Sequence, residues 1–268
     1  MPADFGILFL GDIVGRPGRR AMDKFLPGLI KKYGPSIVVA NGENAAGGSG
    51  ITEEIGADLF MHVDVLTSGT HIWDKKEALP YLDREPRLLR PANYPAVNPG
   101  RSSYVFRSAD GIKAAVLNLQ GRVFMEPLDC PFKRADEEIE ALRAETPLII
   151  VDFHAEATSE KQALGWHLDG RVTAVIGTHT HVPTSDERVL PKGTAYITDA
   201  GMAGGRNAVI GIAREPALQR FLTSRPQRFE PSRDGLFLSG VFIRADASTG
   251  KALSITREVL AEDGSHEE

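Results

Sequence analysis

The chain has 268 residues, of which 42% are hydrophobic and 25% charged, a balance typical of an ordinary globular protein. The net charge of −5 argues against a strong nucleic-acid-binding surface or an anionic-membrane surface, so any phosphate chemistry must depend on a local site. The opening "MPADFGILFLGD" lacks a basic leader, and no segment approaches the roughly 18 apolar residues of a membrane-spanning helix, so we expect no signal peptide and no membrane partner.

Apolar, β-branched runs alternate with stretches of helical spacing along the chain. The predicted strands cover residues 5–10, 36–41, 63–69, 113–119, 147–153, 172–177 and 194–201. The predicted helices cover residues 19–34, 52–63, 75–85, 132–145 and 158–170. The strands are continuously apolar, which indicates burial on both faces, and the alternation predicts an α/β architecture.

The C-terminal part changes character. Residues 235–260 read as two strands joined by a tight "STG" turn, which predicts an antiparallel hairpin. No repeat, low-complexity tract or Pro/Ser linker marks a boundary, so we expect one domain over residues 1–268. The single cysteine, Cys130, fits a reducing compartment, and we expect a cytoplasmic protein.

Polar side chains stand at the carboxyl ends of five predicted strands. They are Asp12; Glu43 and Asn44; Thr70 and His71; His154; and His179 and His181. Because ligands of α/β sheets bind at the carboxyl ends of strands, we expect these side chains to meet.

The stretch "AVIGTHTHVPTSD" places His179 and His181 one residue apart. On an extended chain alternate side chains point the same way, so both rings are expected on one face, where together with His154 they favour a metal site. A lone histidine is more often a core or surface residue, and we interpret His62, His167 and His266 in that way; His266 lies outside the residues that the structure describes. Asp12 taken by itself is explained equally well as a helix cap.

The types of donor atom narrow the choice of metal ion. Imidazole with carboxylate and amide oxygens, and no thiolate, suits Mn, Fe or Zn better than a closed structural zinc site. Two ions are favoured over one, because four such ligands already complete the coordination of one tetrahedral ion and further candidate ligand residues remain. Two ions about 3.5–4 Å apart polarise a phosphoryl group and generate a bridging hydroxide.

The ordered motifs resemble a known family. "GDIVGRPGR", "NGENAAGG", "TSGTHIWDK", "RPANYP", "NLQGRVFM", "DFHAEATSEK" and "TDAGM" span residues 11–202 in order, with "GTHTHVP" near the end. The chain resembles the calcineurin-like metallophosphoesterases, and more closely their YmdB-like bacterial branch. The resemblance implies a four-layer αββα sandwich with two central mixed sheets, and a metal-dependent phosphodiesterase that is often oligomeric and acts on substrates including 2′,3′-cyclic nucleotides.

The resemblance also implies a site of two ions, most consistent with Fe and/or Mn. Carried over by position, Asp12, Asn44 and His181 bind the first ion, Glu43 bridges both, and His154 and His179 bind the second. His71 protonates the leaving oxygen or holds a phosphate oxygen. One position departs from the family pattern, because Thr70 stands where an asparagine ligand of the second ion is expected, and a hydroxyl is a poorer donor.

Alternatives stay open. An amidohydrolase-type metalloenzyme also uses a His-x-His pair, but near its first strand, whereas this pair lies past residue 178. A regulatory, metal-containing nucleotide-binding protein with incidental turnover gains some support from Thr70. Trp73 and Tyr94 are candidates for stacking on a base, although packing in the core or rim is favoured for each.

Overall fold

The computed structural model of the protein describes residues 4–262. The strands are β1 (Asp4–Ile13), β2 (Ile37–Asn41), β3 (Val65–Thr67), β4 (Ser103–Arg107), β5 (Lys113–Gln120), β6 (Ile149–His154), β7 (Ala174–Thr178), β8 (Arg188–Val189), β9 (Ala195–Ile197), β10 (Met202–Gly205), β11 (Leu236–Asp246) and β12 (Ala252–Ala261). The helices are α1 (Gly15–Tyr33), α2 (Glu53–Leu59), the 3₁₀ turn η1 (Thr70–Trp73), α3 (Ala78–Arg84), α4 (Pro131–Arg143), α5 (Thr158–Leu168) and α6 (Arg214–Thr223).

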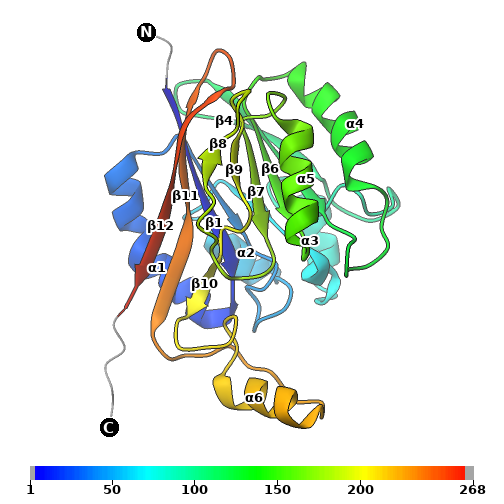
Figure 1. The fold of residues 1–268 in the computed structure, drawn as a ribbon, viewed down its shortest axis with the longest axis vertical. Helices are drawn as coiled ribbons and strands as arrows, with labels where there is room; N and C mark the ends of the chain where they lie inside the picture. The colour runs from blue at the N-terminus through cyan, green and yellow to red at the C-terminus, as the bar shows by residue number, and fades with distance from the viewer. Residues whose placement is uncertain (1–3, 263–268) are drawn as a thin grey trace.

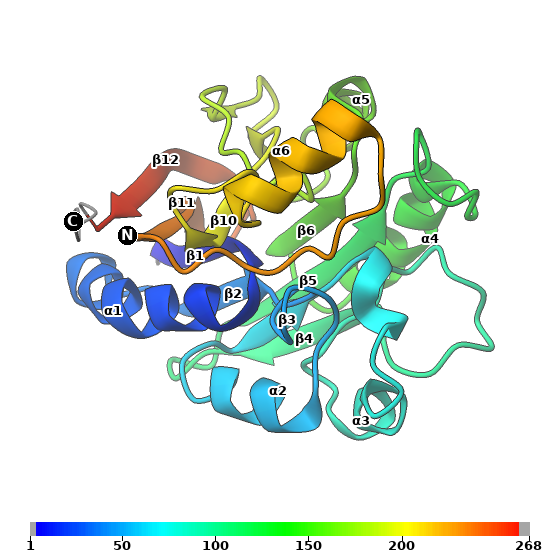
Figure 2. The same cartoon turned by 90° about the horizontal axis from the view of Figure 1, so that it is seen from below.

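In the described part of the chain, two six-stranded mixed sheets pack face to face between helices (Figure 1). One sheet has the strand order β12-β11-β10-β1-β2-β3, and the other has β4-β5-β6-β7-β9-β8. Helices α1 and α2 lie on the outer side of the first sheet, and α4 and α5 on the outer side of the second (Figure 2). The predicted four-layer α/β sandwich is confirmed.

Three hydrophobic cores separate these four layers. Alternate residues of β1 serve two of them, because Phe5, Ile7 and Phe9 face the second sheet while Leu8 and Leu10 face α1. A third core lies between the second sheet and helices α4 and α5. Burial on both faces explains why the predicted strands were apolar throughout.

The central strands of each sheet are parallel, so their carboxyl ends lie at the same edge of that sheet. β1, β2 and β3 run parallel in the first sheet, and β5, β6, β7 and β9 run parallel in the second. The predicted strand 194–201 is wrong in one respect. After β9 the chain leaves the second sheet, turns at Gly201, whose φ of 81° suits glycine, and enters the first sheet as β10.

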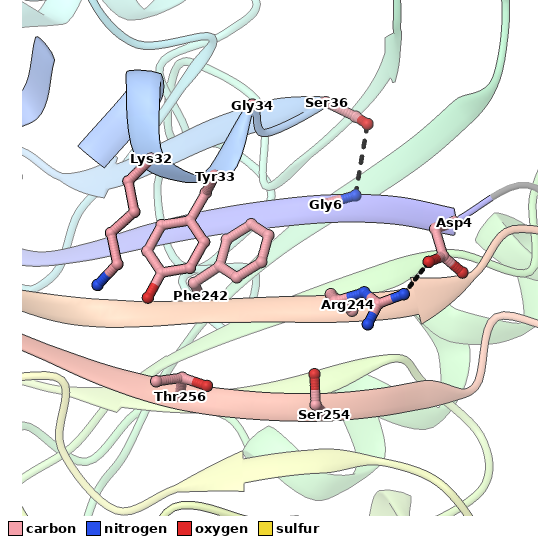
Figure 3. Close-up of a pocket in the computed structure, with 10 residues that line it drawn as sticks. All are labelled: Asp4, Gly6, Lys32, Tyr33, Gly34, Ser36, Phe242, Arg244, Ser254 and Thr256. Atoms are coloured by element: carbon pink, nitrogen blue, oxygen red, sulfur yellow. Dashed lines mark hydrogen bonds and ion pairs between the residues drawn. The ribbon is translucent and has the colours of Figure 1, made fainter. Parts of the chain in front are cut away.

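The predicted C-terminal hairpin is confirmed, with β11 antiparallel to both β12 and β1. It packs against the end of α1, where Tyr33 stacks on Phe242 at 4.0 Å between ring centroids, beside a cavity of about 430 Å³ (Figure 3). Lys32 Nζ adds an ion pair to Glu258 Oε1 at 2.8 Å. Among residues 4–262, no helix is both long enough and apolar enough to cross a membrane.

Candidate metal centre

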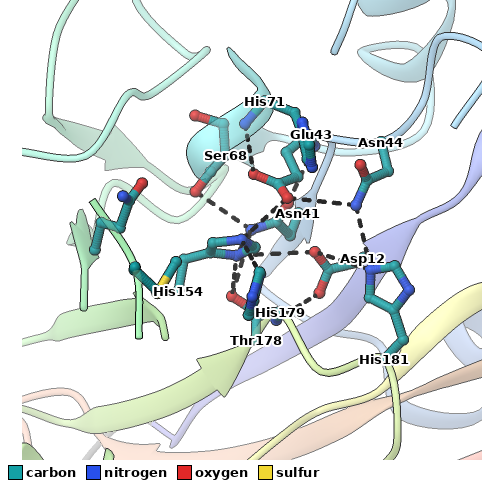
Figure 4. A network of polar contacts seen from close by, with 12 residues as sticks. Asp12, Asn41, Glu43, Asn44, Ser68, His71, His154, Thr178, His179 and His181 are labelled. Carbon is teal, nitrogen blue, oxygen red and sulfur yellow. Dashed lines mark hydrogen bonds and ion pairs between the residues drawn. The ribbon is translucent and has the colours of Figure 1, made fainter. Parts of the chain in front are cut away.

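The polar side chains at the five strand ends lie together in a mostly buried cluster between the two sheets (Figure 4). Asp12 comes from the end of β1, Glu43 and Asn44 follow β2, and His71 lies in η1 after β3. His154 ends β6, and His179 and His181 follow β7. The parallel strands of both sheets therefore deliver their ends to one place.

Glu43, His154 and His179 form the tightest group, with donor atoms all within 4.8 Å of one another. His154 Nε2 lies 3.0 Å from Glu43 Oε1 and 3.0 Å from His179 Nδ1. All three atoms are Lewis bases when the rings are neutral, so their approach is repulsive unless a cation or a proton stands between them.

Asp12, Asn44 and His181 form a second group beside the first. His181 Nε2 lies 3.2 Å from Asn44 Nδ2 and 3.8 Å from Asp12 Oδ1. Asp12 is fully buried, and its Oδ1 has no hydrogen-bond partner among the described residues. A buried carboxylate oxygen without a partner is costly, and a bound cation removes that cost.

The space around the donors also fits an ion. A Cβ atom added to Gly69 would lie 2.1 Å from His154 Cδ2 and 2.2 Å from Glu43 Oε2, so only glycine lets the backbone approach this closely. Carboxylate, imidazole and amide donors without thiolate are the set that first-row transition ions take in open catalytic sites. The residues present therefore fit the dinuclear centre that the resemblance implies.

The two paired histidines reach the cluster by a route that the sequence did not predict. We expected His179 and His181 to share a face of extended chain, but β7 ends at Thr178 and both lie in a bend with positive φ, 101° and 64°. Positive φ is unfavourable for non-glycine residues, so neighbouring contacts must stabilise the bend. Asp12 Oδ2 accepts from the His179 N–H at 3.1 Å and contributes one of them.

A buried ion pair beneath this bend provides more support. Lys161 and Asp199 are both almost fully buried, with 2.7 Å between Nζ and Oδ2. Asp199 Oδ2 also accepts from the backbone N–H of Thr180 at 3.1 Å and from its hydroxyl at 2.7 Å. Thr180 separates the two histidines, so the pair holds the centre of the bend.

Outer partners set the tautomer of each candidate ligand histidine. Thr178 donates its hydroxyl to Asp152 Oδ1 at 2.7 Å, so it accepts from His154 Nδ1–H at 2.9 Å and leaves the lone pair on Nε2. The Ile210 carbonyl accepts from His181 Nδ1–H at 2.8 Å, with the same effect. These partners, which the sequence did not single out, orient the lone pairs toward the cluster.

In His179 the two ring nitrogens have the opposite roles, since Nδ1 and not Nε2 faces the cluster. Its Nε2 lies 3.1 Å from the half-exposed carboxylate of Glu156, which only accepts, so Nε2 carries the proton and Nδ1 faces His154. Glu156 belongs to the "DFHAEATSEK" segment, and its place two residues after His154 was the available signal.

His71 stands at the rim of the cluster, with a side chain 44% exposed. Its Nδ1 lies 2.9 Å from Asp74 Oδ2, and its backbone N–H donates to Glu43 Oε2 at 3.3 Å. Thr70, which is half-buried, begins η1 between Gly69 and His71. This leaves His71 Nε2 for a substrate, because Asp74 occupies the other ring nitrogen.

The charges of the cluster favour a proton on His154. Burial lowers the pKa of His154, but the charges of Glu43, Asp12 and Asp152 outweigh it and raise that pKa to about 9. Burial raises the pKa of Glu43, but His154 and the other histidines lower it to about 2. Burial and the charge of His154 lower the pKa of His179 to about 3.

Comparison with known proteins identifies close relatives. A family model described as YmdB-like protein matches residues 8–258. The chain is 51% identical to a 2′,3′-cyclic-nucleotide 2′-phosphodiesterase of Bacillus subtilis, over 96% of this chain and 97% of that protein. It is 38% identical to a putative phosphatase/phosphodiesterase of Mycoplasma genitalium, over 93% and 90% of the two chains.

Solved structures agree with this similarity. A hypothetical protein from Thermus thermophilus superposes with a TM-score of 0.90 at 40% identity, covering 97% of this chain and 100% of that one. A protein described as a novel phosphatase from Mycoplasma pneumoniae superposes with a TM-score of 0.92 at 38% identity, covering 98% and 96%.

Proposed function

The chain belongs to the YmdB-like protein family, and from that premise we propose that it hydrolyses 2′,3′-cyclic nucleotides at a dinuclear metal centre. It is a phosphodiesterase of the metallophosphoesterase type. The observation that carries the proposal is the meeting of Glu43, His154 and His179, whose donor atoms lie within 4.8 Å of one another, at the carboxyl ends of the strands. The unpartnered Asp12 Oδ1 supports a second position beside it.

The proposed ligands divide by position. Asp12, Asn44 and His181 would hold one ion, His154 and His179 would hold the other, Glu43 would be shared by both, and Thr70 would be the weakest ligand of the second. The donor set favours Fe and/or Mn. When bound, the two ions supply Lewis acidity that polarises the phosphoryl group and lowers the pKa of a water nucleophile.

The protein's own residues supply orientation and proton transfer. Asp74 accepts from His71 Nδ1–H at 2.9 Å and so orients the ring of His71, which lines the cavity over the cluster. With both ring nitrogens protonated, Nε2–H would give its proton to the leaving oxygen and leave a neutral ring whose Nδ1–H stays on Asp74. His71 is therefore proposed as the catalytic acid rather than a ligand.

The proposal has three further parts. One metallophosphoesterase domain covers the chain, since the three cores are joined by shared strands. The single cysteine supports a cytoplasmic location. A homo-oligomer is proposed, supported by the exposed apolar side chains Leu218, Phe221 and Leu222 on α6, which are 53–79% exposed.

The test begins with metal analysis of protein purified without chelator. We expect close to two transition ions per chain, cleavage of 2′,3′-cyclic nucleotides in preference to phosphomonoesters, and loss of turnover after EDTA treatment with recovery on adding Mn²⁺ or Fe²⁺. His154→Ala is expected to lose metal and activity. His62→Ala is the matched control, because His62 is a partly exposed histidine outside the cluster. Full turnover after verified metal removal would contradict the proposal, and tight nucleotide binding without turnover would favour a regulatory protein.

A further inference from the structure

A single cavity of about 540 Å³ opens over the metal centre, within the range of small-ligand sites. Part of its lining is polar and includes Glu43, His71 and His179. The apolar part of the lining consists of Val14, Ile210, Ile212, Phe229 and Pro231. A ligand filling the cavity therefore meets both ionic groups and an apolar surface.

Most of the apolar part of the lining comes from one segment, the β10–β11 connection (residues 206–235), which includes α6. It lies below the carboxyl ends of the strands in Figure 1, on the side that Figure 2 views. Phe229 is 48% exposed and Ile210 is 50% exposed, so neither is absorbed into a core. Both side chains have free surface on the cavity side to offer a ligand.

Backbone contacts hold this apolar surface in place. Ile212 forms an antiparallel bridge with Pro231, the Ala213 N–H donates to the Glu230 carbonyl at 3.0 Å, and the Ser232 N–H donates to the Gly211 carbonyl at 2.8 Å. Phe229 directly precedes this ladder, so its position follows from it.

The connection is also tied to the metal centre itself. The Ile210 carbonyl accepts from His181 Nδ1–H at 2.8 Å. Ile210 has φ of 47°, a conformation that branched side chains rarely adopt, which indicates that this contact and the ladder hold it. The apolar surface therefore keeps a defined distance from the groups that hold the phosphate.

The two aromatic residues near the site that the sequence suggested are used elsewhere. Tyr94 is only 6% exposed, and Trp73 packs edge-on against it at 5.2 Å between ring centroids. Neither is among the described residues that line the cavity. A base bound over the metal centre thus has Phe229 as its available aromatic partner.

The charge of the connection favours a phosphate-bearing ligand over a purely apolar one. Residues 206–235 contain six arginines and three acidic residues in a chain of net charge −5. None of these arginines is among the described residues that line the cavity, so they contribute the net positive charge of the segment, which attracts a phosphate-bearing ligand at longer range, while stacking falls to Phe229. An acyl chain would gain from the apolar surface but not from these charges.

We propose that Phe229, with Ile210 beside it, is the nucleobase-binding surface of this enzyme and makes it selective for nucleotide phosphodiesters over those without a base. This inference rests on the proposed phosphodiesterase function. The base stacks on Phe229 while the cyclic phosphate reaches the ligand cluster. Removal of a stacking aromatic typically weakens recognition about 5- to 100-fold.

The test compares two substrates with the same reacting group. One is adenosine 2′,3′-cyclic phosphate, and the other is the 2′,3′-cyclic phosphate of 1-O-methylribose, which has no base. We expect wild-type kcat/KM to favour the nucleotide by about 5- to 100-fold, Phe229→Ala to abolish most of that ratio, and Phe229→Trp to keep it. Phe124→Ala is the matched control, since Phe124 is 90% exposed and is not among the described residues that line the cavity.

Each result decides a separate point. A Phe229→Ala ratio equal to that of wild type would overturn the base-binding role, as would equal turnover of both substrates by the wild-type enzyme. Wild-type enzyme that cleaves neither substrate would refute the proposed function instead. A fall of the ratio in Phe124→Ala equal to that in Phe229→Ala would also overturn the assignment to Phe229, because the effect would not depend on a residue that lines the cavity.

Discussion

Removing the charge of Lys161 is expected to loosen the bend that carries His179 and His181. Lys161→Met leaves Asp199 buried without its counter-ion, a change that costs about 3–5 kcal/mol in buried pairs. Asp199 keeps the Thr180 N–H and hydroxyl and the Gly201 N–H at 2.8 Å, so we expect the lower end, about 3 kcal/mol. For a chain of this size that corresponds to a Tm lower by roughly 6–12 °C.

The assay is thermal unfolding of metal-free protein, followed by calorimetric titration with Mn²⁺ at a temperature where the variant is folded. Weaker metal binding in the folded variant is expected, because the bend is positioned through Thr180. Lys161→Met combined with Asp199→Asn should recover part of the Tm, since it removes the uncompensated charge but keeps an acceptor.

Lys24→Met is the matched control, because it breaks an exposed pair with Glu262 that is worth about 0–1 kcal/mol. A Lys161→Met protein with a Tm within about 3 °C of wild type and unchanged metal affinity would refute the reasoning. A lower Tm with unchanged metal affinity would assign the pair to global stability and not to the bend.

Three further predictions concern the site itself. His71→Ala should lower kcat about 10²–10⁴-fold for alkoxide leaving groups but much less for p-nitrophenolate, with metal content unchanged; equal losses for both would exclude the acid role. Thr70→Asn should raise the affinity of the second ion in a calorimetric titration, and identical isotherms would mean that the hydroxyl or a water serves as well. Metal uptake at neutral pH should release about one proton, because the pKa of His154 is raised to about 9 and its proton competes with the ion below that pH. Titrations in two buffers of different ionisation enthalpy measure that proton, and a buffer-independent enthalpy would contradict it.

The strands that carry the site were predictable because their apolar runs are long and each ends in a polar side chain. Asp12, Glu43 and His154 could be selected on that ground, since parallel strands deliver their ends to one edge. The two-residue strand β8 and the four-residue β10, with its two glycines, carry too few apolar residues for a periodicity to appear. Their pairing depends on neighbouring strands that only the folded chain supplies.

The residues that orient the candidate metal ligands were not predictable, because in the sequence they look like ordinary strand residues. Thr178 lies in an apolar run, and only its register opposite His154 on β6 lets it accept the Nδ1 proton. The bend at His179 is similar, because its positive φ depends on contacts from Asp12, which is far away in the sequence. The spacing of His179 and His181 indicated that the two side chains act together. It did not indicate the positive φ angles that bring both side chains to the cluster.

The β10–β11 connection contacts a proposed metal ligand and also lines the cavity proposed for the substrate. Its Ile210 carbonyl fixes the tautomer of a proposed metal ligand, while Phe229, a few residues before β11, lines the same cavity. A change in the length or conformation of this segment would move both at once, because the ladder between residues 211–213 and 230–232 transmits the shift. Side-chain replacement of Phe229 leaves that ladder and the Ile210 carbonyl in place. Substrate preference is therefore open to change by side-chain substitution here, whereas rearrangement of the backbone alters the metal centre as well.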